Sequence, residues 1–405
     1  MKELANSTIT PMVDPKWRFL SAALGLFGFL AAGPNAFATW HAANTGEEMV
    51  PLASIPAGGT GVTVFATDSH GVLNELWYWG GKWNSYPIYN QNAAALTASA
   101  VYVQSPVSPT LNLYYIAHLD ADGEVRLTSW DHINGWKTQF VDTGFLWNPS
   151  GYEQMAALMF QGTLYIFYTG GSANTPYPLL KYAMYDGNVL TTKNLDGVEA
   201  APGGTASSMG TPTAVAAPDG LHVYYYDYWN GVLREAFSPD GVNWTRFMVI
   251  DGGPSQYPVG YLPSAIVYSN GATWSINVFY TQMVDSKLRI AQIYPGIGNI
   301  PGIAYFGTVD DINLSSNKAV LLHDGKIFAY YVSPAGQIRV AWGAGPGALF
   351  TAALDGTGPG DLTNGNGSVQ DPIGPPVFGV EVNGVGPSVF YLDITFGSLR
   401  NAYWK

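Results

Sequence analysis

Hydrophobic and polar positions alternate along short segments that recur through most of the chain. Residues 111–117 (LNLYYIA), 221–227 (LHVYYYD) and 276–281 (INVFYT) are typical. Successive side chains of a strand point to opposite faces, so a period of two predicts β-strands. A more apolar segment precedes each of these, as at residues 264–268 (SAIVY), and clusters of Gly, Pro, Asn and Asp separate them. The pattern therefore predicts hairpins of short antiparallel strands.

One phrase follows these segments seven times and has its fullest form at residues 231–244, GVLREAFSPDGVNW. A further predicted strand comes after it, as at residues 243–251 (NWTRFMVID), so each repeat contains four strands. The aliphatic residue that begins the phrase recurs at steps of 52, 55, 53, 55, 50 and 61 residues, at Leu73, Val125, Leu180, Leu233, Leu288, Ile338 and Leu399.

A four-stranded sheet of this kind cannot bury both faces alone and must stack on its neighbours. The repeats therefore predict an all-β fold, a seven-bladed β-propeller of four-stranded blades that occupies residues 39–405 as a single domain. The seventh repeat stops after its third strand, and an open ring would expose a strand edge. Residues 37–44 (FATWHAAN) carry a Trp like the one that begins several fourth strands. We predict that this N-terminal strand completes the seventh blade; the alternative is a disordered remnant of a leader.

Composition excludes several classes of partner and site. The chain has 405 residues, a net charge of -12 and only 11% charged residues, so it lacks the basic surface that nucleic acid requires. It has no cysteine, which excludes disulfides, thiol catalysis and cysteine metal ligands. Stability must come from the packed core.

The first 38 residues read as a leader. Lys16 and Arg18 precede an apolar run at residues 19–32, and residues 36–38 (AFA) have the form of a signal-peptidase site. We predict export with removal of residues 1–38, and hence a secreted or extracellular protein. An uncleaved signal-anchor that attaches the protein to a membrane is the alternative.

At residues 210–244 the chain resembles the fungal fucose-specific lectin family of β-propellers, and the repeat pattern extends the resemblance over most of the chain. The family is known for six blades, whereas seven repeats are counted here. The resemblance implies that each pocket between blades holds a sugar, with an Arg on the second strand, a Glu on the third and an aromatic wall near the next blade. Charged partners make strong hydrogen bonds to vicinal hydroxyls, and an aromatic ring receives the apolar face of the sugar.

Carried onto this chain, the family's Arg position holds no arginine in any repeat, and its Glu position is retained only at Glu75 and Glu235. The resemblance then implies two degenerate carbohydrate-binding pockets, one formed by His222, Glu235 and Tyr257 and one formed by Thr63, Glu75 and Tyr89. Two structural alternatives stay open. Glu235 would pair with Arg234 or Arg246, and His222 would be an exposed histidine of a strand.

Cations also recur beside the Glu position, at Arg126, Lys181, Arg234, Arg289, Arg339 and Arg400. Their alternation with that position places them on the opposite face of the strand. We predict a structural role for them, either pairing between adjacent blades or capping turns. The aromatic second strands are predicted to fill the space between blades.

Catalysis has little support in the sequence. A glycosidase needs two carboxylates at a defined separation, and many of the 29 acidic residues lie in Asp-Gly turns. The six histidines lack the close spacing of a zinc site, and no glycine-rich phosphate loop is present. We therefore predict no enzymatic activity, no metal and no cofactor.

The sequence favours an exported, non-catalytic, lectin-like propeller that binds glycans or glycoproteins. The alternative is a structural or protein-interaction propeller in an extracellular or membrane-attached assembly that has lost sugar binding. The sugar and the oligomeric state, including homo-oligomerisation, stay open.

Overall fold

The computed structural model divides the chain into two compact units, Met1–Thr39 and Trp40–Lys405. It describes residues 40–404 except 45–48, 58–60, 80–81, 90–96, 104–112, 121, 132, 144–154, 173–174, 198–200, 206–208, 253–261, 272, 283–284, 298–299, 314–317, 334–336, 356–372, 383–385 and 394–397. The predicted leader, residues 1–38, and Tyr257 lie outside the described residues.

All 28 described elements are strands, and they form antiparallel four-stranded sheets in chain order. The first three sheets are β2 (Met49–Ala57), β3 (Gly61–Asp68), β4 (Leu73–Trp79) and β5 (Lys82–Tyr89); β6 (Ala98–Val103), β7 (Leu113–Leu119), β8 (Glu124–Asp131) and β9 (Gly135–Thr143); and β10 (Ala156–Phe160), β11 (Thr163–Ser172), β12 (Thr175–Tyr185) and β13 (Leu190–Asp196).

The fourth to sixth sheets are β14 (Met209–Ala217), β15 (Gly220–Asp227), β16 (Val232–Ser238) and β17 (Arg246–Gly252); β18 (Ser264–Ser269), β19 (Trp274–Thr281), β20 (Lys287–Ile297) and β21 (Ile300–Asn313); and β22 (Ala319–His323), β23 (Lys326–Val332), β24 (Ile338–Gly343) and β25 (Phe350–Asp355). The seventh contains β26 (Ile373–Val382), β27 (Gly386–Asp393), β28 (Ser398–Trp404) and β1 (Trp40–Asn44).

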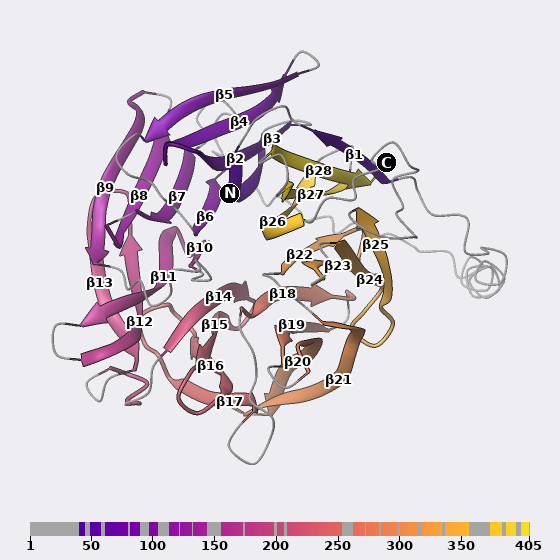
Figure 1. Cartoon of the computed structure of the whole chain (residues 1–405). Helices are drawn as coiled ribbons and strands as arrows, with labels where there is room; N and C mark the ends of the chain where they lie inside the picture. Colours follow the sequence, from indigo (N-terminus) through magenta and orange to yellow (C-terminus); the bar gives the residue numbers. More distant parts are fainter. Residues whose placement is uncertain are drawn as a thin grey trace, which may run out of the picture. The chain divides into compact units, whose positions relative to one another are not determined.

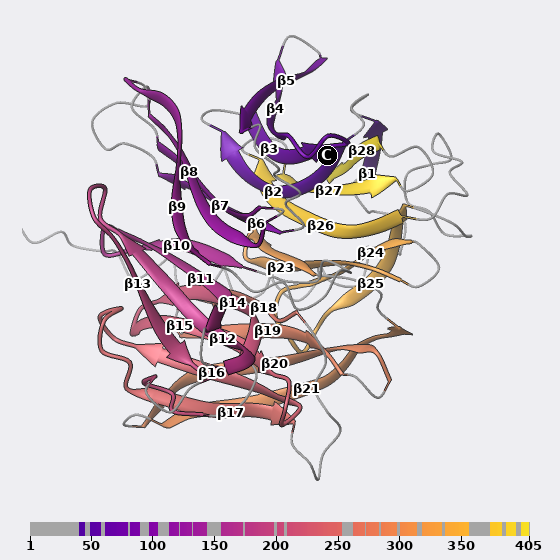
Figure 2. The ribbon, with the colours of Figure 1, turned by 60° about the vertical axis from the view of Figure 1, so that its left-hand side comes forward.

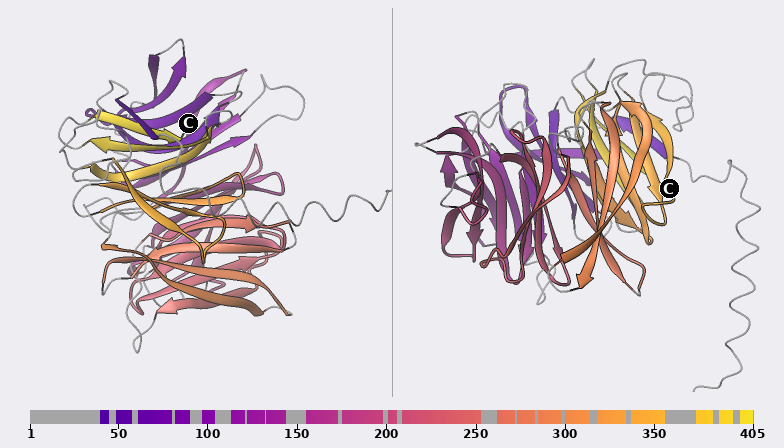
Figure 3. Two further views of the ribbon diagram at one scale, coloured as in Figure 1. Left: turned by 90° about the vertical axis from the view of Figure 1, so that its right-hand side faces the viewer. Right: turned by 90° about the horizontal axis from the view of Figure 1, so that it is seen from below.

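Within the unit Trp40–Lys405 the sheets are arranged around a centre (Figure 1). The first strand of each sheet is innermost, and each innermost strand contacts those of the two neighbouring sheets, including β2 with β26. Figures 2 and 3 show the twist of the sheets, which lets each one pack its two faces against its neighbours.

The N-terminal strand closes the ring. β1 pairs antiparallel with β28, with Trp40 opposite Trp404 and Asn44 opposite Arg400. The prediction that the N-terminus completes the last sheet is confirmed by the strand Trp40–Asn44, and residues 37–39 of the predicted segment lie outside the described residues. The pairing removes the open edge that β28 would otherwise present.

The prediction of seven regular blades, each with four short strands, is wrong at the fifth sheet. Every other described strand pair slips register at most once, whereas β20 and β21 slip four times and run on for 11 and 14 residues. Pro295 and Pro301 lack a donor for the ladder, and Gly307 bulges with a φ of +67°. Thus six of the described sheets have a regular outer pair of strands and the fifth does not.

The core consists of apolar clusters that lie between adjacent sheets. Between the third and fourth sheets, for example, Phe167 and Tyr182 pack against Val223 and Tyr225. The largest fully buried side chains are Tyr and Phe, almost all of them from the second strands of the sheets. The prediction that these aromatics fill the space between blades is confirmed.

A carboxylate at the end of a fourth strand also joins neighbouring sheets. Asp196 of β13 accepts a hydrogen bond from Tyr225 of β15 at 2.6 Å and lies 3.7 Å from the guanidinium Nε of Arg234 in β16. The equivalent groups, in the order Asp, Tyr and cation, are Asp142, Tyr168 and Lys181, and Asp310, Tyr331 and Arg339; Asp251 and Tyr280 repeat the Asp–Tyr part. We call these arrangements inter-sheet latches.

The latches confirm the predicted structural role of Lys181, Arg234 and Arg339 between adjacent sheets. Arg126 and Arg289 instead have partners within their own sheets. Arg126 pairs with Asp120 and Glu124. Arg289 pairs with Asp285 and donates a hydrogen bond to Thr308. These two fit the turn-capping alternative. The side chain of Arg400 lies outside the described residues.

Candidate functional site

The outward half of the fourth sheet carries a row of polar side chains on the face that packs against the fifth sheet. His222 of β15 is directly opposite Phe237 of β16, which in turn is opposite Arg246 of β17. Glu235 lies two residues before Phe237, so it shares this face. Alternation along three paired strands therefore brings His222, Glu235 and Arg246 together.

Glu235 is fully buried and accepts three hydrogen bonds. The donors are His222 Nδ1 at 2.8 Å, Tyr224 Oη at 2.9 Å and Arg246 Nε at 2.9 Å. Burial alone would raise the pKa of Glu235, but the hydrogen bonds and charges of His222 and Arg246 outweigh it and lower that pKa. The carboxylate is thus ionised, and its three hydrogen bonds are to groups of the protein itself. The predicted alternative of pairing with Arg246 is confirmed.

His222 lies between two carboxylates. Its Nδ1 contacts Glu235 and its Nε2 lies 2.8 Å from Asp219 Oδ1, in the turn that joins β14 and β15. A neutral imidazole has only one N–H, so donation at both positions requires the imidazolium. Burial disfavours that charge, yet the hydrogen bonds to Asp219 and Glu235 raise the pKa of His222. His222 is buried, which excludes the alternative of an exposed strand histidine.

A cavity of about 150 Å³ opens beside this group, between the fourth and fifth sheets. Asp219, His222 and Arg246 line it from the fourth sheet, and Arg246 also lies over the Phe237 ring at 4.3 Å. The opposing wall is apolar and aromatic, formed by Trp274, Ile293, Tyr294, Pro295 and Pro301. Charged hydrogen-bonding groups therefore face an aromatic wall across a small space.

Among the described residues the site differs from the one expected in three respects. Glu235 is behind the cavity lining and supports His222 and Arg246. The described aromatic wall is Trp274 and Tyr294, and the predicted role of Tyr257 stays a prediction. The arginine comes from the fourth strand of the sheet, where the resemblance placed it on the second. Asp219 was missed as well, although the Asp-Gly turn before His222 was visible in the sequence.

The residues predicted for the first repeat do not form a comparable group. Thr63, Glu75 and Tyr89 lie on one face of the first sheet but in separate rows, opposite Trp77, Phe65 and Leu73, respectively. The centre of the Tyr89 ring lies 5.2 Å from the centre of the His118 ring. In the pairing of the third and fourth strands, Tyr89 occupies the position that Asp142 and Asp196 occupy in the latches. Sugar binding by this group stays a prediction.

Glu75 differs from Glu235 although both occupy the same position of the repeat. No hydrogen bond from another described residue reaches its carboxylate, and burial raises its pKa to about 7. The folded state therefore holds this proton up to about pH 7, whereas the unfolded chain loses it near the ordinary value of 4.5. By linkage, the contribution of the protonated Glu75 carboxyl to the free energy of unfolding is fully present below pH 4.5 and is lost as the pH rises to about 7.

We expect Glu75→Gln to stabilise the protein at pH 8 by about 3 kcal/mol, since the pKa of Glu75 rises from 4.5 to about 7 on folding and a pKa difference of one corresponds to about 1.4 kcal/mol. At pH 4 the substitution should change little. Urea unfolding at several pH values measures the difference, and Glu124→Gln, at a half-exposed ion pair with Arg126, is the control. Parallel stability profiles for Glu75→Gln and the natural protein would contradict the assignment.

Two absences hold for the part of the chain that the structure describes. No group of three His, Asp or Glu side chains could hold a metal ion. Among the same residues, no helix is long and apolar enough to cross a membrane.

Comparisons with known proteins support the fold. The sequence matches no protein-family model and no curated protein. Among solved structures, the BP39L lectin from Burkholderia pseudomallei is similar, with 18% identity over 91% of this chain and 95% of that chain and a TM-score of 0.60. AofleA from Arthrobotrys oligospora has 16% identity over 78% and 90% of the two chains (TM-score 0.48). The six-bladed fungal lectin from Aleuria aurantia has 17% identity over 78% and 95% (TM-score 0.46).

At this identity the likeness concerns the fold alone. The similarity to the bacterial lectin covers nearly the whole of both chains, which confirms the predicted resemblance at that level. The described unit therefore has the fold of a lectin-type β-propeller.

Proposed function

We propose that this protein binds carbohydrate, without chemical change of the sugar, at the cavity between the fourth and fifth sheets. The observation that carries the proposal is the placement of Asp219, His222 and Arg246 across from Trp274 and Tyr294 in one cavity. The structural neighbours agree with it, since they include the BP39L lectin and a fungal lectin that recognises fucose.

The charges of the site suit a neutral polyhydroxylated ligand. The cations His222 and Arg246 are matched by the anions Asp219 and Glu235, so the group has little net charge while the imidazolium persists. Asp219 is the most exposed member, with 37% of its side chain accessible, and accepts hydrogen bonds from a ligand most readily. Hydroxyl groups of a sugar donate to such a carboxylate, and the aromatic wall receives its C–H face.

We expect Asp219→Asn to weaken glycan binding about 10- to 100-fold, because a hydrogen bond to a charged group contributes about 1.5–3 kcal/mol. The measurement is a glycan array followed by calorimetric titration of the strongest binder. Asp324→Asn is a matched control, since Asp324 occupies the corresponding Asp-Gly turn of the sixth sheet beside His323.

The control variant should bind as the natural protein does. Equal affinity of the Asp219→Asn variant would remove Asp219 from the site, and a folded protein that binds no glycan on the array would refute the proposed function. The second candidate function in that case is a propeller that serves protein interactions in an extracellular or membrane-attached assembly, and the absence of an arginine at the family's sugar position in every repeat favours it. Export, from the pattern of residues 1–38, belongs to both proposals.

A further inference from the structure

Exposed apolar side chains gather at one class of turn. Among the described residues nine large hydrophobic side chains are exposed, and five of them lie in or beside the turn between the third and fourth strands of a sheet. Each comes from a different sheet, the first, second, third, fourth and sixth, and in that order they are Tyr78, Ile133, Val189, Val242 and Phe350. A single exposed hydrophobic residue needs no explanation, but repetition at one structural position does. We call these five residues the apolar tips.

The latches show that the first six sheets run in the same direction. Each latch joins the end region of a fourth strand to the second half of the second strand in the next sheet, as Asp196 of β13 does with Tyr225 of β15. The rings of Tyr89 and His118 make the same connection between the first and second sheets. The turns between second and third strands are therefore at one end of the ring, the latch end, and the turns between third and fourth strands are at the other. The apolar tips thus share one end, which we call the tip end.

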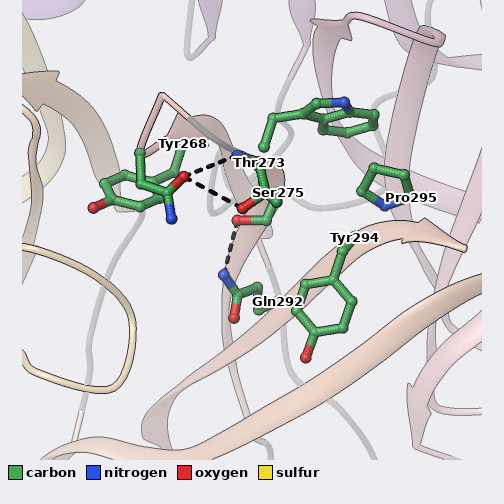
Figure 4. Close-up of a pocket in the computed structure, with 8 residues that line it drawn as sticks. Tyr268, Thr273, Ser275, Gln292, Tyr294 and Pro295 are labelled. Atoms are coloured by element: carbon green, nitrogen blue, oxygen red, sulfur yellow. Dashed lines mark hydrogen bonds between the residues drawn. The ribbon is translucent and has the colours of Figure 1, made fainter.

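The tip end also carries two cavities, on opposite sides of the fifth sheet. The cavity at Asp219, in the turn before β15, is on the side of the fourth sheet. The other, of about 570 Å³, is on the side of the sixth sheet, where Tyr268 donates a hydrogen bond to the carbonyl of Ala344. The described residues that line it are uncharged, and Gln292 Nε2 donates to Ser275 Oγ at 2.8 Å (Figure 4). The tip end therefore combines projecting apolar side chains with recessed polar groups.

Three of the tips are fixed by turns of the same construction. In each, an Asp carboxylate accepts a hydrogen bond from the backbone N–H of the tip residue, in the pairs Asp131 with Ile133 at 2.8 Å, Asp186 with Val189 at 2.8 Å and Asp240 with Val242 at 2.9 Å. A turn that is already fixed loses little conformational entropy when its side chain enters a contact. The aliphatic side chains are thus presented to a partner without rearrangement.

The spacing of the tips fits a bilayer and does not fit a protein interface. Packed sheets are about 10 Å apart, so side chains from different sheets are separated by about that distance or more. A specific protein interface needs a continuous, packed patch of about 800 Å² on each partner, which separate turns do not provide. A bilayer accepts each apolar side chain independently, and the strength of binding follows the apolar area that is buried.

The charges of the tip end favour a bilayer without net charge. Exposed Lys82 and Lys326 begin strands that follow two of its turns, and exposed Asp186 and Asp324 lie in turns at the same end. Among the described residues, these opposite charges leave no basic patch that would attract anionic lipid. Tyr78 suits the boundary layer, because Tyr is enriched where a membrane meets water.

We infer that the tip end docks on the surface of a lipid bilayer, with the apolar tips at the boundary between headgroups and acyl chains. This inference goes beyond the proposed function and does not require it, because the contact is with lipid and involves no sugar. Taken together with the proposed function, it directs the cavity at Asp219 toward glycans that a membrane carries.

Fluorescent labels at single positions test the inference on the full chain. The chain has no cysteine, so one introduced cysteine takes a polarity-sensitive label at a chosen residue. Vesicles of pure phosphatidylcholine should shift the emission of labels at Ile133→Cys and Val242→Cys to the blue. The matched controls are Val249→Cys, at an exposed valine within β17, and Trp229→Cys, in an exposed turn at the latch end, and their emission should not shift.

Cosedimentation with the same vesicles measures the affinity. The triple variant Ile133→Ser, Val189→Ser and Val242→Ser should bind about 100-fold or more weakly than the natural protein, since keeping an aliphatic side chain in water costs about five- to tenfold at each position. The triple control, which removes exposed apolar surface from the outer strands and should bind as the natural protein does, is Tyr86→Ser, Phe140→Ser and Val249→Ser.

Tip labels that do not respond to vesicles, or that respond no more than the labels at Val249 and Trp229, would overturn the inference. So would a tip triple variant that keeps the natural affinity. A blue shift that follows the protein concentration instead of the vesicle concentration would assign the tips to contacts between copies of the chain, and would equally overturn it. The glycan array is measured without vesicles, so its result for the proposed function is independent of these outcomes.

Discussion

Replacement of Glu235 by Gln is expected to destabilise the fold by about 3–5 kcal/mol at neutral pH. The carboxylate has no exposed surface and is the common acceptor for His222, Tyr224 and Arg246. Removing one member of a buried, hydrogen-bonded charge group leaves the others without compensation, which accounts for a penalty of this size. Urea unfolding with linear extrapolation measures it.

The pH dependence of this effect follows from the direction of the pKa shift. The pKa of Glu235 is lower in the folded state, so its stabilising effect is present above the ordinary value of 4.5 and is lost as the pH falls through the folded value. The penalty of Glu235→Gln should therefore shrink in acid.

Glu75→Gln is the matched comparison, because the two glutamates occupy the same position in different repeats and are expected to respond with opposite sign. A destabilisation below about 1 kcal/mol for Glu235→Gln would show that the buried contacts contribute little beyond what they cost in desolvation.

This expectation also decides which variants can test sugar binding. A loss of binding in Glu235→Gln would combine a direct effect with disorder of His222 and Arg246, because the carboxylate positions both. Asp219 is partly exposed and lines the cavity, so its substitution reports on the ligand more directly. Under the proposed function, Glu235 is therefore a positioning residue.

The architecture was accessible from the sequence because its signals are local and repeated. Alternation with a period of two identifies the strands, and the recurring aliphatic anchors give the repeat. The unpaired last repeat and the segment around Trp40 identify the closing strand, which pairs with β28 as expected. Even the cation at Arg234 could be assigned a structural role, since it alternates with Glu235 along one strand.

The site was less accessible because it depends on register between strands. Arg246 reaches Glu235 only through the pairing of β16 with β17, and that pairing slips between Leu233 and Arg234. A slip of one residue exchanges the two faces of a strand, and the sequence carries no mark of it. Trp274 belongs to the next repeat, so its place opposite His222 depends on the packing of two sheets. The irregular outer pair of the fifth sheet has the same origin, since four slips accumulate between β20 and β21.

Asp196→Asn is expected to destabilise the protein by about 3–5 kcal/mol, by loosening the latch between the third and fourth sheets. Asp196 is fully buried and accepts from Tyr225 Oη and Thr205 Oγ1, both at 2.6 Å, and from the backbone N–H of Gly197 at 2.8 Å. An Asn amide replaces one acceptor oxygen with a donor, which leaves a buried hydroxyl or N–H without a partner. It also removes the anion nearest to the Arg234 Nε.

The equivalent substitution at Asp142 should cost less, because that side chain is 20% exposed and water can replace part of the lost contact. Asp186→Asn, in an exposed turn, is the control and should leave the unfolding midpoint nearly unchanged. A double-mutant cycle of Asp196→Asn with Tyr225→Phe isolates the contact across the sheets, and residues in such contact couple by about 0.5–3 kcal/mol. Strict additivity of the two substitutions would mean that the latch does not join the sheets energetically, and that the apolar clusters between them hold the ring alone.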